Sequence, residues 1–343
     1  MSVRNPGGSG VTLLDVAREA GVHVSTVSRA LDPAHHARVK DATRIHIEAV
    51  ADKLGYRPDM VARGLKSGRT AAVGVIVADL GNTFVTPVIH GLTAAVETAG
   101  MMPMIAETED NHDRFSNILD HMLSRRVDAM VVTSARLADR EILESAGRIV
   151  PIVVAGRPLD DTSLPQVIVD EAAGGRLVAE HFAELGHRQV AQLRGPVDVA
   201  NFPRRSAGFS AACAAAGVEE VHVQEAATLP IIDEGRRIMQ ALIDQARRLP
   251  SAIFAQNDLM ALGALSLLRD NGIVVPDDVS LAGYNNLPTV GHVSPGLTTV
   301  NYPSMDVGRL AGEMILNLLA GESVEDVVLE PELVVRQSTQ AKA

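Results

Sequence analysis

From Ala71 onward, the sequence alternates short runs rich in β-branched residues with amphipathic stretches. Segments such as "AAVGVIVAD", "VDAMVVTS" and "SAIFAQND" have the composition of buried strands, whereas "GGRLVAEHFAELGH" and "ALGALSLLRDNG" have apolar residues at helical spacing. A chain that repeats strand, helix and strand forms parallel sheets, because each crossover helix packs on a face of the sheet. Residues 71–343 are long enough for two such sheets. The predicted fold class is therefore α/β, with two doubly wound parallel sheets.

The amino-acid composition favours the same fold class. Of the 343 residues, 46% are hydrophobic but only 3% are aromatic, and Trp is absent. The core must therefore be packed mainly by Ala, Val, Leu and Ile, which suits helices on a sheet better than a β-sandwich. Cys213 is the single cysteine, which excludes a disulfide framework and a cysteine-based metal site. We predict a buried thiol there, and no metal or cofactor.

The charge is distributed unevenly along the chain. The whole sequence has a net charge of -11, yet residues 1–70 contain 11 Lys and Arg against 7 Asp and Glu. An acidic total does not exclude binding to nucleic acid when one segment is basic. We expect a small basic domain followed by an acidic body.

Three short helices are predicted in the basic segment, after a disordered tail at residues 1–10. Thr12 and Asp15 have the spacing of a capping box for the first helix. The second helix is predicted over residues 24–31 and the third over residues 41–54. The third helix has an apolar stripe, expected to face the core, at Ala42, Ile45, Ala49 and Leu54.

A tight glycine turn between the first two helices is typical of a helix-turn-helix, whose second helix enters the major groove of DNA. Val22, Val27 and Leu31 are expected to face the core. Ser28 and Arg29 then lie on the outer side, together with Val24 and Ser25, where such side chains can contact bases or phosphates. Taken alone, the pattern also fits an ordinary short helix with solvated polar residues.

Several longer motifs resemble the LacI/GalR family of bacterial transcription regulators. "TLLDVAREAGVHVSTVSRAL" is followed by "LGYRPDMVARGLKSGRTAAVGVIV", and the likeness continues through "LAGYNN", "SPGLTTVNYP" and "DVGRLAGEMILNLLAGE". The resemblance implies a DNA-binding domain (11–57), a hinge helix and linker (58–70), and a core (71–343) for effector binding and dimerisation. The core is expected to be two-lobed and similar to a type I periplasmic binding protein. Its lobes are expected at residues 71–168 with 301–324, and at residues 169–300 with 325–340.

The family pattern also implies which residues meet DNA. His23 departs from the family, which usually has Ser there; it is expected to cap the helix or stay solvated, with a phosphate contact or a pH-sensitive charge as the alternative. The hinge is too short to be stable alone, and Leu65 is expected to wedge between central base pairs in the minor groove unless it is an exposed linker residue. The residues implied to contact DNA are Thr12, His23, Val24, Ser25, Thr26, Ser28, Arg29, Leu65 and Lys66.

A ligand site is expected at the carboxyl ends of the strands, where two facing lobes form a cleft. Polar or aromatic residues that follow predicted strands are Asn82, Phe84, Arg157, Asn257 and Asn285. The resemblance adds Asn201, Arg205 and Tyr302. Each asparagine has an alternative as a turn former or helix cap, and Asp258 is expected to cap a helix rather than contact the ligand.

The charge of this cleft is a separate hypothesis. Sugar-binding members of the family often have Asp where this chain has Gly156 and Asn285, whereas Arg157 and Arg205 are present here. The cleft is therefore expected to be neutral to basic and to suit an acidic or phosphorylated sugar-like effector.

The protein is therefore expected to be a cytoplasmic transcriptional regulator, and specifically a repressor. It is expected to bind a pseudo-palindromic operator in double-stranded DNA as a homodimer. The sequence does not decide between a dimer and a tetramer. It also does not decide whether the effector releases the protein from DNA (induction) or tightens its binding (corepression). The first alternative, the solute-binding protein of a sugar transporter, has no use for residues 12–70 and would need a signal peptide. An enzyme is not expected, because no G-x-G-x-x-G, phosphate-binding loop or G-x-S-x-G motif is present, and the histidine pair at 35 and 36 has no ligand cluster nearby. No membrane partner is expected.

Overall fold

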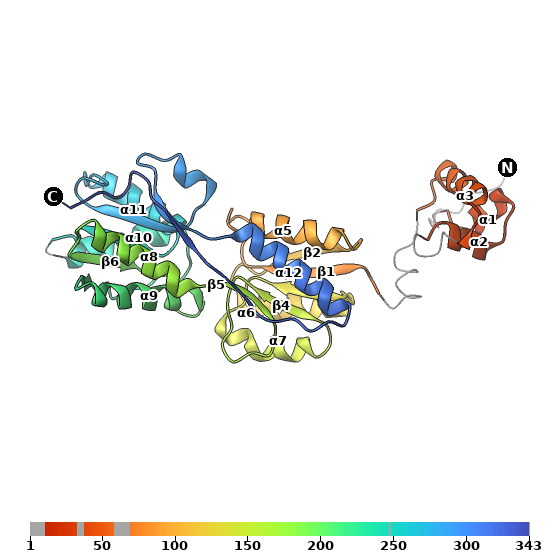
Figure 1. The fold of residues 1–343 in the computed structure, drawn as a ribbon, viewed down its shortest axis with the longest axis horizontal. Helices are drawn as coiled ribbons and strands as arrows, with labels where there is room; N and C mark the ends of the chain where they lie inside the picture. Colours follow the sequence, from red (N-terminus) through yellow and green to blue (C-terminus); the bar gives the residue numbers. More distant parts are fainter. Residues whose placement is uncertain (1–10, 33–37, 58–68, 247, 343) are drawn as a thin grey trace. The chain divides into compact units, whose positions relative to one another are not determined.

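The computed structural model describes residues 11–32, 38–57, 69–246 and 248–342 (Figure 1). The chain divides into two compact units, residues 1–70 and 71–343. The predicted tail, the hinge helix with Leu65 and Lys66, and the histidine pair at 35 and 36 lie outside the described residues.

Within residues 11–32 and 38–57, the structure describes three helices of the first unit, and the predicted capping box is confirmed. The helices are α1 (Leu13–Ala20), α2 (Val24–Ala30) and α3 (Asp41–Leu54). Thr12 Oγ1 accepts a hydrogen bond from the Asp15 backbone N at 3.3 Å, and the Asp15 carboxylate accepts one from the Thr12 backbone N at 3.0 Å. Gly21 then adopts the left-handed conformation, with φ at 66°, that ends α1. Leu31 is already the C-cap of α2, so this helix is one residue shorter than predicted.

The predicted buried face of α3 is wrong. Ile47, Val50 and Ala51 are buried against α1 and α2, whereas Ala42 is exposed and Ile45 is 58% exposed. Apolar residues occur on both sides of α3, and the two partner helices cover one of those sides. The sequence pattern alone does not tell which side that is.

The second unit contains two six-stranded sheets, which we call the N-lobe sheet and the C-lobe sheet (Figure 1). The N-lobe sheet has β1 (Ala72–Val77), β2 (Met102–Glu107), β3 (Ala129–Val132), β4 (Ile152–Ala155), β5 (Gln166–Val169) and β11 (Val327–Leu329), in the order β11-β5-β4-β3-β1-β2. The C-lobe sheet has β6 (Gln189–Leu193), β7 (Glu219–Val221), β8 (Ala252–Ala255), β9 (Ser280–Asn285), β10 (Thr298–Asn301) and β12 (Glu332–Val334), in the order β12-β10-β9-β8-β6-β7. The pairings are parallel except that of β12 with β10, which is antiparallel. The predicted α/β class is confirmed, with one antiparallel edge strand in addition.

Helices cover both faces of each sheet. On the N-lobe sheet, α5 (Val85–Glu97) and α12 (Ser304–Leu319) cover one face, and α6 (His112–Ser124) and α7 (Arg140–Gly147) cover the other. On the C-lobe sheet, α8 (Glu171–Glu184) and α9 (Asn201–Ala215) cover one face, and α10 (Ile232–Gln245) and α11 (Asp258–Asp270) cover the other. Two short 3-10 turns, η2 (Leu137–Asp139) and η3 (Pro288–Gly291), complete the loops. The two lobes are therefore three-layered and built alike.

The chain crosses between the lobes three times within residues 69–246 and 248–342. The crossings lie between β5 and α8, between β10 and α12, and between β11 and β12. The predicted boundary at residue 325 is wrong, because Val327 in β11 still pairs with Val167 in the N-lobe sheet. The third crossing therefore comes after Leu329.

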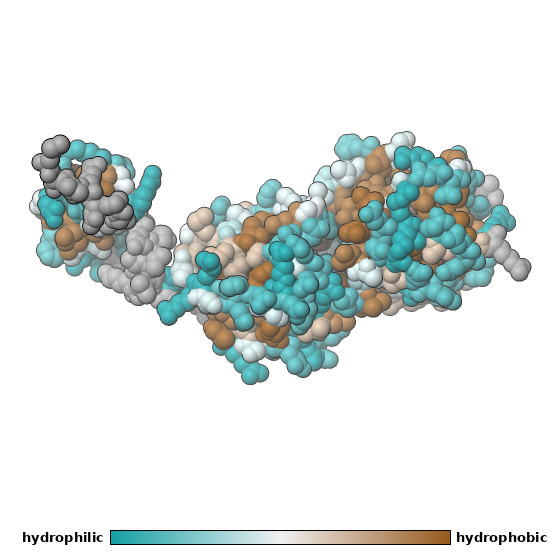
Figure 2. Space-filling model, turned by 180° about the vertical axis from the view of Figure 1, so that it is seen from behind, coloured by the Kyte–Doolittle hydropathy of each residue, from teal (hydrophilic) through white to brown (hydrophobic). Residues whose placement is uncertain are grey.

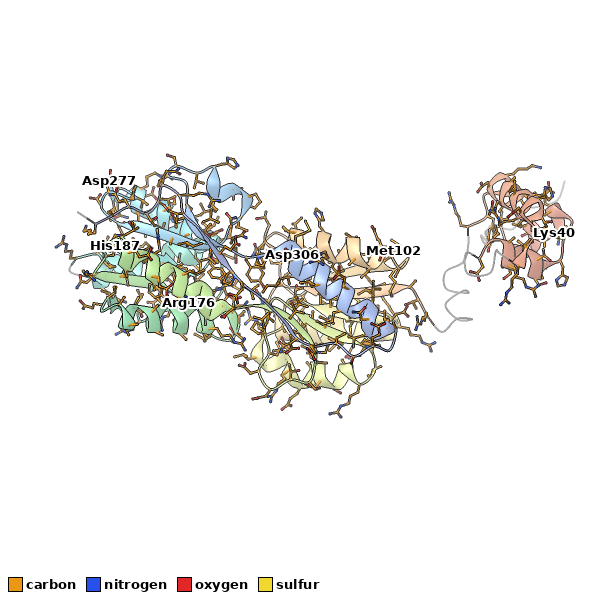
Figure 3. The ribbon with its side chains drawn as sticks, in the orientation of Figure 1. Lys40, Met102, Arg176, His187, Asp277 and Asp306 are labelled. Carbon is orange, nitrogen blue, oxygen red and sulfur yellow. The ribbon has the colours of Figure 1, made fainter. Side chains whose placement is uncertain are left out.

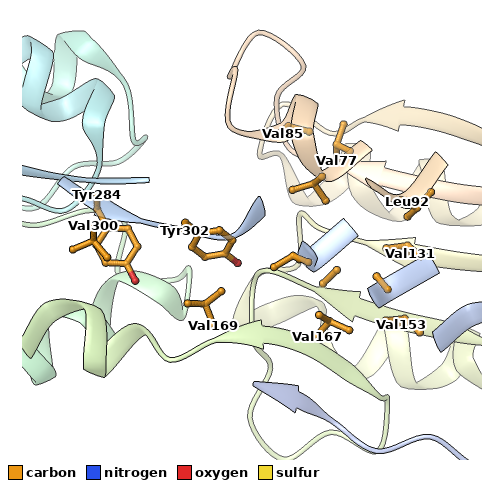
Figure 4. Packing of buried hydrophobic residues seen from close by; sticks show 14 of the residues in the cluster. Val77, Val85, Leu92, Val131, Val153, Val167, Val169, Tyr284, Val300 and Tyr302 are labelled. Atoms are coloured by element: carbon orange, nitrogen blue, oxygen red, sulfur yellow. The ribbon is translucent and has the colours of Figure 1, made fainter. Parts of the chain in front are cut away.

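Buried aliphatic side chains fill the space between the sheets and their helices. Figure 4 shows Val77, Val131 and Val153 of the N-lobe sheet in the same cluster as Tyr284 and Tyr302, which lie toward the C-lobe. The cluster thus continues from one lobe to the other. Over the surface of residues 71–343 seen in Figure 2, hydrophilic and hydrophobic residues are interspersed.

No helix in the described part of the chain is both long and apolar enough to cross a membrane. Within the same residues, no group of three or more His, Cys, Asp or Glu side chains is arranged to hold a metal ion.

Helices α5 and α12 touch backbone to backbone at a reciprocal pair of glycines. A Cβ placed on Gly91 would lie 2.1 Å from the Met305 carbonyl oxygen, and one on Gly308 would lie 1.9 Å from the Val88 carbonyl oxygen. The same reciprocal arrangement joins α8 to α9 at Gly175 and Gly208, and α10 to α11 at Gly235 and Gly263. In each of these three helix pairs, the backbones are therefore too close for a residue with a Cβ atom to replace either glycine.

The C-terminal segment is held to the C-lobe through His187, which is labelled in Figure 3. The His187 ring is buried, with Nδ1 at 2.9 Å from Ser251 Oγ and Nε2 donating to the Gln340 carbonyl oxygen at 3.1 Å. Burial lowers the pKa of His187 below its usual value, because it disfavours the charged ring. Below the ordinary histidine pKa, the unfolded chain therefore binds more protons than the folded chain.

We expect the free energy of unfolding to fall as the pH drops from about 7.5 through the ordinary histidine range to about 5.5. Part of this loss should disappear in a His187→Gln variant, measured by urea unfolding at both pH values. His292→Gln, at an exposed position, is the control. An equal pH dependence in all three proteins would contradict the assignment to His187.

Candidate functional site

A cavity of about 280 Å³ lies between the two lobes, entirely within residues 71–343. Its wall contains every residue that the sequence predicts for the ligand site: Asn82, Phe84, Arg157, Asn201, Arg205, Asn257, Asn285 and Tyr302. Most of them follow the carboxyl ends of strands, as expected for parallel sheets, and two come from the first turns of α9. The described geometry brings these residues together, and their role in binding a ligand stays a prediction.

Arg205 is the most deeply buried cation of this wall, with a side chain 4% exposed. Its Nε donates to a Glu171 carboxylate oxygen at 2.5 Å, and its Nη1 donates to the Gln256 carbonyl oxygen at 2.7 Å. The guanidinium also lies over the Tyr284 ring, 3.7 Å from its centroid. Burial alone would lower the pKa of Arg205, but the Glu171 carboxylate outweighs it and the pKa is raised. Arg205 is therefore a fixed and fully paired cation.

Arg157 is likewise paired with a carboxylate, that of Asp110 in the N-lobe. Its Nη1 and Nη2 donate to the two carboxylate oxygens of Asp110 at 2.5 and 3.1 Å, and Nη1 also donates to the Ser134 carbonyl oxygen at 3.2 Å. Burial tends to raise the pKa of Asp110, but Arg157 and then Arg136 outweigh it, so that pKa is lowered. Asp110 is thus ionised and held by cations.

These two pairs correct the expected charge of the cleft. The predicted neutral to basic character depended on free cations at Arg157 and Arg205, whereas Asp110 and Glu171 neutralise them. Two further carboxylates in the wall are Asp79 and Glu109. The cavity therefore offers an anionic ligand no unpaired arginine.

Two asparagines of the cavity wall have buried side-chain oxygens without a hydrogen-bond partner. The Oδ1 atoms of Asn201 and Asn285 are buried and accept no hydrogen bond. Asn201 is held through Nδ2, which donates to the Gly156 carbonyl oxygen at 2.8 Å and to Glu171. The backbone of Asn285 has φ at 112°, a strained value for a residue with a side chain. Buried acceptors without partners are costly, so these two oxygens are unsatisfied in the ligand-free structure.

An aromatic pair adds an apolar surface. Phe84 and Tyr302 meet edge to face with ring centroids 4.9 Å apart, and the Tyr302 hydroxyl donates to the Gly156 carbonyl oxygen at 3.2 Å. Figure 4 shows the Tyr302 hydroxyl directed away from the C-lobe. The wall thus combines an apolar surface with a few fixed polar groups, as small-molecule sites commonly do.

The expected cap of helix α11 is wrong by one residue. Asn257, not Asp258, is the N-cap: its Oδ1 accepts from the Met260 backbone N at 2.8 Å. The buried Asp258 carboxylate instead accepts hydrogen bonds from Leu287 N at 2.7 Å and Thr299 Oγ1 at 2.6 Å. Asp258 therefore ties the loop after β9 to α11 and is not in the cavity wall.

In the first unit, the outer side of α2 is formed by few side chains. Arg29 is exposed, and Ser25, Thr26 and Ser28 are half-buried. Val24, predicted on the outer side, packs partly against the buried cluster of the three helices. Arg29 and the hydroxyl groups are thus the groups of α2 best placed for a partner.

His23 caps α2 through its ring. Nδ1 accepts a hydrogen bond from the Ser25 backbone N at 3.2 Å and lies 2.8 Å from Ser25 Oγ. The ring nitrogen thereby replaces the side-chain oxygen that usually caps a helix. The prediction that His23 caps the helix is therefore confirmed.

Loss of this cap is expected to destabilise α2. His23→Ala should lower the stability of the three-helix unit by about 0.5–2 kcal/mol, whereas His23→Ser restores an oxygen acceptor and should cost less. Hydrogen exchange of amides in residues 21–31 reports the change, and His46→Ala on the exposed side of α3 is the control. Equal protection in His23→Ala and the unchanged protein would rule out the cap.

Comparison with known proteins follows this geometry. Residues 12–59 match the model of "Bacterial regulatory proteins, lacI family", and residues 179–339 match "Periplasmic binding protein-like domain". The HTH-type transcriptional regulator CelR of Thermobifida fusca is 32% identical over 340 residues, covering 95% of this chain and 98% of CelR. The chain belongs to the lacI family of bacterial regulatory proteins. This lacI-family protein is also 30% identical to catabolite control protein A of Priestia megaterium over 335 residues, with 96% and 99% of the two chains covered.

Solved structures agree with the family. The lac repressor dimer bound to operator and the anti-inducer ONPF has a TM-score of 0.88 at 26% identity, covering 97% of this lacI-family protein and all of that chain. A complex of the transcriptional regulator CelR with cellobiose has a TM-score of 0.72 at 30% identity, with 96% and 99% covered. The likeness therefore includes both the helix-turn-helix and the two-lobed core.

Proposed function

We propose that this lacI-family protein is a transcriptional repressor that binds a pseudo-palindromic operator as a dimer and responds to a small effector in the cavity between its lobes. The observation that carries the proposal is the combination in one chain of a capped helix-turn-helix and a cavity lined by all eight residues expected from the sequence. The relative of known structure bound to operator and anti-inducer supports both halves of this combination. The function requires no catalysis.

For the effector we propose a neutral, sugar-like molecule rather than an anion. Both arginines of the wall are neutralised, two asparagine oxygens lack donors, and the Phe84 and Tyr302 rings supply an apolar surface. A CelR protein of 30% identity in complex with cellobiose supports a carbohydrate. This replaces the acidic ligand expected from the sequence.

Dimerisation is supported by the edge of the N-lobe sheet. Met102, labelled in Figure 3, belongs to the edge strand β2. Its exposed fraction is 72%, and that of Ile105 in the same strand is 40%. Exposed apolar residues on an unpaired edge favour contact with another chain. The similar lac repressor structure is a dimer, which supports dimerisation of this chain.

Selection of duplexes from a random DNA pool by the full-length protein tests the DNA-binding half. Two-fold symmetric half-sites are expected among the enriched duplexes. Replacing Arg29 with alanine should weaken binding to the selected duplex about tenfold in fluorescence anisotropy. Lys53→Ala, which removes an exposed cation of α3 paired with Glu19, should have a much smaller effect. Enrichment of no sequence, or equal losses in both variants, would contradict the proposal.

The same anisotropy assay tests the effector. Glucose and cellobiose are compared with glucuronate and glucose 6-phosphate as neutral and anionic probes, alongside isothermal titration. We expect any response to come from neutral sugars, and its sign distinguishes induction from corepression. Tight binding confined to the anionic sugars would restore the acidic ligand and refute the neutral one.

A further inference from the structure

A continuous row of charged side chains leads from the cavity wall to the opposite lobe. Arg157 in the wall binds Asp110 with both terminal nitrogens. The Asp110 Oδ1 atom that Arg157 Nη1 binds also lies 3.7 Å from Arg136 Nε. Arg136 in turn forms an ion pair with Asp198, which belongs to the loop between β6 and α9 of the C-lobe. The Leu137 backbone N also donates to the Asp198 carbonyl oxygen, at 3.1 Å.

The backbone conformation at Asp110 indicates that the surrounding structure holds this residue in place. Glu109 and Asp110 are consecutive residues with φ at 52° and 54°, in the left-handed region that costs energy for residues with a side chain. Such conformations persist where the surroundings hold them, and they gather at functional sites. Here they place a carboxylate, 8% exposed, between two arginines.

Arg136 depends on these neighbours. Its side chain is 17% exposed, and its buried Nε has no hydrogen-bond partner. Arg136 is half-buried beside Asp110 and Asp198, and removing or turning either carboxylate leaves its charge less well compensated. The orientation of Asp110 therefore influences the contact of Arg136 with Asp198.

We propose that Asp110 is a positioning residue that links the contents of the cavity to the closure of the two lobes. The inference rests on the proposed function, because it gives the cavity a regulatory ligand. A ligand that hydrogen-bonds Arg157 or Asp110 turns the Asp110 carboxylate, and Arg136 then changes its hold on the C-lobe. The hydrogen bonds of Arg157 go to Asp110 and Ser134, both in the N-lobe. Of these two partners, Asp110 is the one whose carboxylate also lies beside Arg136, so the side chain of Arg157 influences Arg136 by way of Asp110. A separate contact joins the lobes where the Gly156 carbonyl oxygen accepts a hydrogen bond from Asn201.

The link is measured in the ligand-free, full-length protein by the distance between two spin labels. Cysteines are placed at exposed positions, Ser145 on α7 of the N-lobe and Ala214 on α9 of the C-lobe. Native Cys213 stays unlabelled, because it is buried and burial raises the pKa of its thiol to about 12. Dilution with unlabelled protein restricts the signal to labels within one chain.

Three variants follow the row from end to end. We expect Asp198→Asn, Asp110→Asn and Arg157→Met each to broaden the distance distribution and move it to longer values. The double variant Asp110→Asn with Asp198→Asn should show no further change, because both substitutions break one row. Asp120→Asn, which removes an exposed carboxylate of α6, should leave the distribution unchanged.

An unchanged distribution in Asp110→Asn or Arg157→Met, or fully additive shifts in the double variant, would overturn the inference. Circular dichroism checks that each variant is folded. If Asp110→Asn is not folded, Arg157→Met decides the test, because it removes the two hydrogen bonds that hold the Asp110 carboxylate. The measurement needs neither operator nor effector. Its failure is therefore separate from a failure of the proposed function, which the DNA and sugar titrations test.

Discussion

Replacing Glu171 with alanine is expected to lower the free energy of unfolding of the two-lobed core by about 3–5 kcal/mol. The substitution leaves the Arg205 guanidinium buried, with its Nε and Nη2 deprived of their acceptors. It also removes an acceptor from Asn201 Nδ2. A buried charge that loses its partner costs far more than the pair contributes, because the desolvation penalty of the remaining ion is uncompensated.

The chain offers a matched control for this variant on the same helix. Glu180 in α8 also pairs with an arginine, Arg176, but both side chains are about half exposed, at 46% and 51%. Glu180→Ala should therefore cost no more than about 0.5 kcal/mol. Urea unfolding at constant pH measures both. Replacing the whole pair, with Glu171→Leu and Arg205→Met together, should destabilise less than Glu171→Ala alone; a larger loss in the double variant would contradict the explanation by an unpaired charge.

Gly308→Ala is expected to destabilise the N-lobe by about 1–3 kcal/mol, although alanine is the better helix former. The added Cβ would lie 1.9 Å from the Val88 carbonyl oxygen. That atom belongs to the backbone of α5, so the clash is relieved only if the two helices move apart. Their buried contacts with the N-lobe sheet would then be disturbed.

Gly147→Ala separates this effect from helix propensity. At Gly147 in α7, the nearest atom to an added Cβ is Leu164 Cδ2, at 2.5 Å, the end of a side chain that can change rotamer. We expect a change between neutral and a gain of about 1 kcal/mol there, from the higher helix propensity of alanine. Thermal unfolding compares the two variants. A similar result for both would mean that α5 and α12 tolerate separation at their crossing.

Features that depend on local sequence were predictable. The capping box of Thr12 and Asp15, the bounds of α3, and the gathering of residues after parallel strands all follow from spacing of a few residues. The alternation of strands and helices also predicts two parallel sheets, because such strands require crossover helices. Local physics is sufficient for each of these.

Features that depend on distant partners were not predictable. The predicted charge of the cleft was wrong because the carboxylates that pair with its arginines are distant in sequence. Glu171 lies 34 residues before Arg205, and Asp110 lies 47 residues before Arg157. Both acids do follow predicted strands, so the rule that selected the asparagines could also have selected them. The boundary after β11 and the buried face of α3 likewise depend on which surface covers them, and one sequence does not contain that information.

The interleaving of the lobes has a consequence for synthesis on the ribosome. The N-lobe is completed by α12 and β11, which end at Leu319 and Leu329, after most of the C-lobe in the sequence. A nascent chain that has already produced the whole C-lobe sheet except β12 therefore still lacks part of its first lobe. Folding of the N-lobe must therefore wait until β11 has been made, and a chain that stops before β11 has an incomplete N-lobe sheet.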